Sequence, residues 1–172
     1  MGYEVRMIVV EKTGTEYETC RVGNQIRMVW REDGQFMQTQ KYYFNDNNTK
    51  MMLPPETKTI KGNDCHIISM IDLCNTGECY CYIDSICKFE DSDGSIVYDP
   101  FNVNKMIGLD YYNNYRNFVP IKVVLKMLNK AVRKSKAKGE APYRRFLVAI
   151  AMLRSIKKTF TNDKIGCLFY GH

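Results

Sequence analysis

Hydrophobic positions in the first part of the chain alternate with polar positions, and this period of two predicts β-strands. The segment YEVRMIVV is short, rich in β-branched residues and followed by a predicted turn at residues 12–15. A second strand is expected around YETCRV, and a third in QIRMVWR, where Ile26, Met28 and Trp30 alternate onto one face. Asp33-Gly34 then predicts a hairpin turn into FMQTQKYYF, because this dipeptide tolerates positive φ angles.

Two further strands are predicted on either side of the cysteine-rich stretch CNTGECYC, residues 74–81. We expect residues 51–64 to form a loop, CHIISMIDL and CYCYIDSICKF to be paired strands, and residues 74–78 to be the hairpin between them. In that register the odd-numbered side chains share a small apolar face and the even-numbered ones a more polar face. The cysteines are then expected to be buried thiols.

From Pro120 onward the apolar positions repeat at helical spacing. In IKVVLKMLNKAVRK they recur every three or four residues, Pro120 fits the first turn, and Gly139 and Pro142 mark a stop and a restart. The second predicted helix, YRRFLVAIAMLRSIKKTF, is apolar around most of its middle, so we expect it to be the more buried of the two. Its run FLVAIAML is too short to cross a bilayer.

Strands followed by helices, without βαβ alternation, predict an α+β fold. We expect an antiparallel β-meander sheet of about six to eight strands, followed by a C-terminal basic helical hairpin packed on one face. The 172 residues fit a single domain, with residues 1–110 mainly β and mildly acidic and residues 118–160 forming a strongly basic helical hairpin.

The net charge of +6 is unevenly distributed. Residues 118–160 contain twelve lysines and arginines and one acid, whereas residues 1–117 contain twelve basic and seventeen acidic residues. Four lysines recur every four residues opposite the apolar stripe of the first helix, so their like charges repel one another. The predicted binding surface comprises Lys122, Lys126, Lys130, Arg133, Lys134, Lys136, Lys138, Arg144, Arg145, Lys157 and Lys158.

This basic surface has three interpretations at the level of the sequence. It is a solvated helix face, a surface that contacts nucleic-acid phosphates, or a surface for an acidic or nucleic-acid-handling protein. The neighbouring YYNNYRNF offers Tyr111, Tyr112, Tyr115 and Arg116 for stacking on bases, although such aromatics also pack between sheet and helix.

Catalytic and metal-binding patterns are weaker. The chain has no phosphate-binding glycine loop, GxSxG or HExxH motif, so we predict no catalytic residue, no metal and no cofactor. One alternative is a metal-dependent enzyme that uses the even-numbered strand face through His66, Asp72 and Asp84. Another is a zinc-stabilised module, although the spacing lacks the paired C-x₂-C of structural zinc sites; its ligands would be Cys74, Cys79, Cys81 and Cys87.

The chain begins MGYEVRMIVVEKTG, which lacks the pattern of a signal peptide, and its seven cysteines are an odd number. We therefore expect reduced thiols, a cytoplasmic location and no membrane association. The resulting hypothesis is a small, non-enzymatic binding protein, of the accessory or inhibitor type that phages and mobile elements encode. It would engage nucleic acid directly, or a host or defence enzyme that handles nucleic acid. A homodimer through the even-numbered face with Tyr80 and Tyr82 is also compatible with the sequence.

Overall fold

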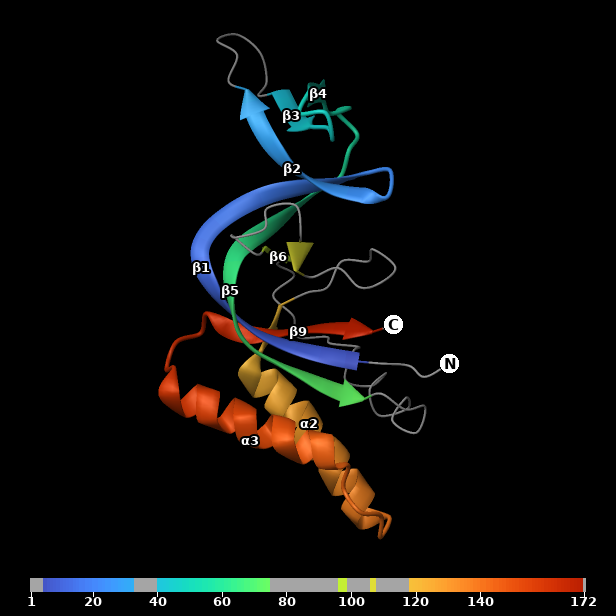
Figure 1. Cartoon of the computed structure of the whole chain (residues 1–172), viewed down its shortest axis with the longest axis vertical. Helices are drawn as coiled ribbons and strands as arrows, with labels where there is room; N and C mark the ends of the chain where they lie inside the picture. The colour runs from blue at the N-terminus through green and yellow to red at the C-terminus, as the bar shows by residue number, and fades with distance from the viewer. Residues whose placement is uncertain (1–4, 33–39, 75–95, 99–105, 108–117, 172) are drawn as a thin grey trace.

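The computed structural model describes residues 5–32, 40–74, 96–98, 106–107 and 118–171. They form an antiparallel sheet with two C-terminal helices packed on it, which confirms the predicted α+β class (Figure 1). The elements, in chain order, are β1 Val5–Val22, β2 Gln25–Glu32, β3 Gln40–Phe44, β4 Lys50–Met52, β5 Thr59–Cys74, β6 Ile96–Tyr98, β7 Met106–Ile107, β8 Val119–Pro120, α2 Ile121–Ala137, α3 Arg144–Thr159 and β9 Ile165–Gly171.

The long, curved strand β1 organises the sheet. The strand order is β4-β3-β2-β1-β5-β6-β7, and β9 pairs with β1 and β8. β5 follows β1 along most of its length, whereas β2 pairs only with its second half and β9 only with its first half. The molecule is therefore elongated, with α2 and α3 at one end of its long axis and β2–β4 at the other (Figure 1).

Two boundaries in the first half differ from the prediction. The predicted turn at residues 12–15 is a bend inside β1, where Gly14 has φ of 93° and the register to β5 shifts between Lys12 and Glu16. The predicted loop at 51–64 is shorter, because β5 already begins at Thr59. Both differences have the same cause. β1 and β5 pair along most of their length, and this pairing continues the strands through residues whose local sequence favours a turn or a loop.

The last strand was not predicted. β9 follows the helices and inserts beside β1, so the hairpin is not the final element of the fold. Its alternation is visible in IGCLFYG: Ile165, Cys167 and Phe169 face the helical core, and Leu168 faces the opposite side of the sheet. One further departure from the expected meander is the parallel pairing of β6 with β5.

The central part of the sheet is buried on both faces. On the helical face, Val5, Met7 and Val9 of β1 pack with β9 and with the apolar stripes of α2 and α3. On the other face, Ile8 and Val10 belong to a second cluster with Cys65, Val97, Phe118 and Leu168. Two-sided burial explains the continuous apolar run in β1, where a half-exposed strand would alternate.

The two helices begin and end close to the predicted positions. α2 starts directly after Pro120, and Gly139, with φ of 73°, follows its end as a left-handed stop. The prediction that α3 is the more buried helix is wrong, since Leu147 and Val148 are 44% and 56% exposed. A helix lying on a sheet buries only one stripe, so the outer side of α3 stays exposed although it includes these two large apolar residues. Neither described helix has the length and hydrophobicity needed to span a membrane.

The predicted faces of β5 are disrupted by a bulge. Ser69 lies opposite Val9, on the helical face, whereas Ile67 lies opposite Val10, which belongs to the other face. The odd-numbered residues therefore do not share one face, and Ile67 is exposed. An extra residue in a strand reverses the side-chain alternation beyond it. Cys74, the first residue of the predicted hairpin, is the last residue of β5, and residues 75–78 and the predicted return strand lie outside the described residues.

Candidate polyanion-binding surface on the helical hairpin

The structure places the predicted basic residues on the outer side of the helical hairpin. Ten of the eleven are exposed, and Arg145 is half-buried. In α2, the lysines at 122, 126, 130 and 134 lie opposite the buried stripe that contains Val124, Leu128 and Ala131. We call these four lysines the α2 lysine ridge.

The α2 lysine ridge is regularly spaced and winds slowly around the helix, because four residues make slightly more than one helical turn. Residues four apart on a helix lie on the same side, about 6 Å apart along the axis. The four lysines therefore cover about 18 Å, which corresponds to about five phosphates of one strand along the axis of a B-form duplex. Long, exposed lysine side chains on this line can each reach a phosphate without a fixed geometry.

Some basic side chains of the hairpin have structural partners. Arg145 Nη1 donates a 3.0 Å hydrogen bond to the backbone oxygen of Asp72, so it fastens the start of α3 to the end of β5. Arg154 Nη2 donates to Asn129 Oδ1 at 3.3 Å and joins the two helices. Arg145 is accordingly a positioning residue more than a free contact residue, which the sequence did not indicate.

The helix dipoles account for another part of the charge. Lys134 and Lys136 lie in the last turn of α2, and Lys157 and Lys158 lie in the last turn of α3. Cations near a helix C-terminus stabilise the helix by about 0.3–1 kcal/mol each. Lys122, Lys126 and Lys130 lie before that turn and gain nothing comparable, so their position needs a different explanation.

Several acidic groups of the strands and of the turn between β3 and β4 pair with basic groups of the strands. Five ion pairs join described residues there: Arg6–Asp72, Arg27–Asp46, Arg31–Glu18, Lys41–Glu18 and Lys50–Glu32. None of the five includes a lysine or arginine of the hairpin. The elongated shape adds to this separation, because most of these pairs lie toward the β2–β4 end (Figure 1).

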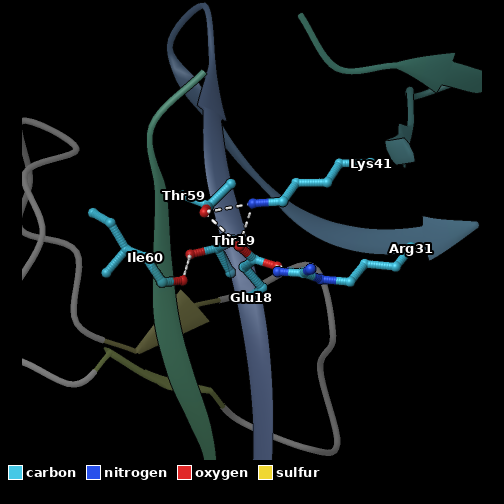
Figure 2. Close-up of polar contacts among 6 residues, drawn as sticks. All are labelled: Glu18, Thr19, Arg31, Lys41, Thr59 and Ile60. Atoms are coloured by element: carbon cyan, nitrogen blue, oxygen red, sulfur yellow. Dashed lines mark hydrogen bonds and ion pairs between the residues drawn. The ribbon is translucent and has the colours of Figure 1, made fainter. Parts of the chain in front are cut away.

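The most connected of these acids is Glu18, which the sequence analysis missed (Figure 2). Its carboxylate accepts hydrogen bonds from Lys41 Nζ at 2.7 Å, from Arg31 Nη2 at 2.9 Å and from the Thr59 hydroxyl. Burial raises the pKa of Glu18, but these hydrogen bonds and the charge of Lys41 outweigh it and lower the pKa to about 2. The network joins β1, β2, β3 and β5 and is structural.

The remaining predicted residues give no assembled site among the described residues. Tyr111, Tyr112, Tyr115 and Arg116 lie outside them, as do Asp84 and the cysteines at 79, 81 and 87. Cys20, Cys65 and Cys167 are buried and are not part of a disulfide, as expected for small apolar residues. Within the described part of the chain, no three histidine, cysteine or acidic side chains gather as metal ligands would.

The β5 bulge also separates the residues of the proposed metal-dependent enzyme. His66 lies opposite Glu11, which is itself opposite Ile165 on the helical face. Asp72 lies opposite Arg6, on the other face, and forms a 2.9 Å ion pair with it. Directly opposed residues share a face of the sheet. The prediction that His66 and Asp72 share one strand face is therefore wrong.

Comparisons with known protein families, characterised proteins and solved structures find no match to this chain.

Proposed function

We propose that this chain is a small binding protein without catalytic activity, and that it binds the phosphate backbone of nucleic acid through the α2 lysine ridge. The observation that carries the proposal is the exposed line of Lys122, Lys126, Lys130 and Lys134, in a hairpin whose sequence holds a single acid. Such a line repels itself in the free protein, and a polyanion relieves the repulsion. Uniform lysines on one helix favour phosphate contacts with little sequence specificity.

A second candidate is an acidic protein partner, as expected of an accessory or inhibitor protein of phage type that acts on a nucleic-acid-handling enzyme. Leu147 and Val148 favour it, because they are exposed on the outer side of α3 among basic side chains. An apolar centre with a charged rim is typical of protein interfaces. Phosphate binding alone gives these two residues no role.

The test is fluorescence anisotropy with labelled single- and double-stranded oligonucleotides over a range of salt concentrations. Four phosphate contacts predict a slope of log affinity against log salt of about −3 to −4. The triple variant Lys122→Glu, Lys126→Glu, Lys130→Glu removes three of these contacts and should flatten the slope by about 2 to 3.

The matched control is Lys58→Glu, Lys61→Glu, Lys164→Glu, three exposed lysines outside the helices. Both triple variants lower the formal net charge from +6 to zero. If the two variants lose affinity equally, binding reflects net charge and the ridge has no special role. If the wild type binds no oligonucleotide at low salt, the phosphate proposal is refuted and the acidic-protein candidate remains, to be tested with Leu147→Ser and Val148→Ser in pull-downs.

A further inference from the structure

The end of the molecule farthest from the helices carries an exposed aromatic face. Trp30 of β2, Tyr42 of β3 and Met52 of β4 lie directly opposite one another across the three strands. Trp30 and Met52 are 45% and 47% exposed, and Phe44, two residues from Tyr42 on the same face, is exposed as well. We call Trp30, Tyr42, Phe44 and Met52 the distal aromatic face.

The distal aromatic face contains a contact between two of its rings and lies on the side of the strands away from their buried cluster. Tyr42 and Phe44 meet edge to face, with ring centroids 5.7 Å apart. The opposite side of the same strands packs inward, where Val29 and Tyr43 contact Cys20 and Leu53. Three strands thus bury one side and present aromatic and methionine side chains on the other. Trp, Tyr, Phe and Met in this density mark interaction surfaces.

The charges on the face balance one another. Lys50 forms a 2.8 Å ion pair with Glu32 across β3, and its ammonium group lies 4.3 Å from the centre of the Tyr42 ring. Lys50 and Glu32 are thus one cation and one anion that pair with each other across the face, with the Lys50 ammonium over the Tyr42 ring. A polyanion would gain little binding energy from this face. A surface that carries an anion opposite Lys50 and a cation opposite Glu32 would complement its charges.

We propose that the distal aromatic face binds a second copy of this chain in an isologous, two-fold contact. Such a contact opposes Lys50 of one copy to Glu32 of the other and joins the aromatic groups between them. It also keeps the two basic hairpins at the outer ends of the dimer, because the helices and β2–β4 lie at opposite ends of each copy (Figure 1). At physiological salt, charges separated by more than about 8 Å are largely screened. If the proposed function holds, the dimer would present two phosphate-binding surfaces.

The size of the face predicts a weak dimer. Four large side chains, each exposed by about half or less, supply a few hundred Å² per copy, whereas stable interfaces bury about 800 Å² per partner. Because buried area does not convert directly into affinity, we expect only that the monomer–dimer equilibrium is weak and depends on protein concentration.

The test uses two neighbouring methionines on β4 that point to opposite sides of the strand. Met52 belongs to the distal aromatic face, and Met51, which is 40% exposed, lies opposite Tyr43 on the other side. Sedimentation equilibrium of the full chain, without nucleic acid, should show the average mass rising above 20.1 kDa with concentration for the wild type and for Met51→Glu. Met52→Glu should weaken association at least tenfold, and Met52→Ser should do so less strongly. Circular dichroism verifies that each variant is folded.

Two further measurements separate this contact from others. Trp30 is the only tryptophan, so its fluorescence should shift to shorter wavelength as the wild type dimerises and should not shift in Met52→Glu. Association should persist in about 1 M salt, which screens any attraction between the basic helical hairpin of one copy and the acidic groups of another copy. A wild type that is monomeric at about 0.5 mM, equal losses in both glutamate variants, or dissociation by salt would each overturn the proposal. Quenching of Trp30 by a single-stranded oligonucleotide, abolished by Met52→Glu, would instead assign the face to nucleic acid. Because the dimer is measured without nucleic acid, its failure leaves the proposed function intact.

Discussion

The Glu18 network provides a quantitative test of what holds the elongated sheet together. Glu18 is only 21% exposed, and its carboxylate is bonded to side chains from three other strands (Figure 2). Replacing it by glutamine keeps the shape and removes the charge. The difference between the ordinary pKa of 4.5 and about 2 sets an upper limit of about 3 kcal/mol on the stability that this charge contributes at pH 7. Partial exposure to solvent reduces the expected loss to about 2 kcal/mol.

The sign of the pH dependence follows from the lowered pKa. The folded chain binds the proton at Glu18 less readily than the unfolded chain, so the stabilisation is complete above about pH 4.5 and is lost as the pH falls toward 2. Urea unfolding of the wild type and Glu18→Gln should therefore differ by about 2 kcal/mol at pH 7 and by about half that near pH 3. Lys41→Met should lower the free energy of unfolding less in the Glu18→Gln variant than in the wild type.

A matched control exists in the exposed ion pair of Asp72 with Arg6. Asp72→Asn should change the unfolding free energy by less than about 1 kcal/mol, because exposed pairs contribute little. If the gap between wild type and Glu18→Gln stays constant from pH 7 to pH 3, the charge is not what stabilises the network and the reasoning is refuted. A gap no larger than that of Asp72→Asn would refute it as well.

Two other predictions concern β9. A Cβ atom on Gly166 would clash with the Phe118 ring and lie 2.5 Å from the Val119 backbone oxygen, so Gly166→Ala should destabilise the fold by about 1–3 kcal/mol. Urea unfolding measures this loss, and an unchanged urea midpoint would show that β8 and β9 can move apart without lowering the stability. Burial raises the pKa of the Cys167 thiol well above its usual range. Alkylation at pH 8, followed by peptide mass mapping, should therefore find Cys167 unmodified until the chain is unfolded. Rapid labelling of Cys167 in the native protein would contradict its burial.

Local patterns in the sequence were sufficient for the helices and for the order of strands before helices. Pro120 and Gly139 fix the ends of α2 because one presets its φ angle and the other adopts a left-handed conformation that side chains disfavour. The lysine ridge followed from the same local periodicity. The pairing of the strands did not follow from local patterns. β1 pairs with β2, β5 and β9, of which β5 and β9 are distant in the sequence, and no local pattern selects among strands with similar alternation.

The surfaces that matter for function show where such patterns fail. Ile26, Met28 and Trp30 were predicted to share a face, but the alternation alone cannot say whether that face or the one with Val29 is buried. Burial is decided by what Cys20 and Leu53 bring from other strands. The sequence of α3 also does not show which of its apolar residues are buried. The helix is apolar around most of its middle, but it packs on the sheet through one stripe, and Leu147 and Val148 are exposed. An apolar residue that the rest of the fold leaves exposed is therefore a better indication of a partner than an apolar residue read from the sequence, and in this chain such residues occur at both ends of the long axis.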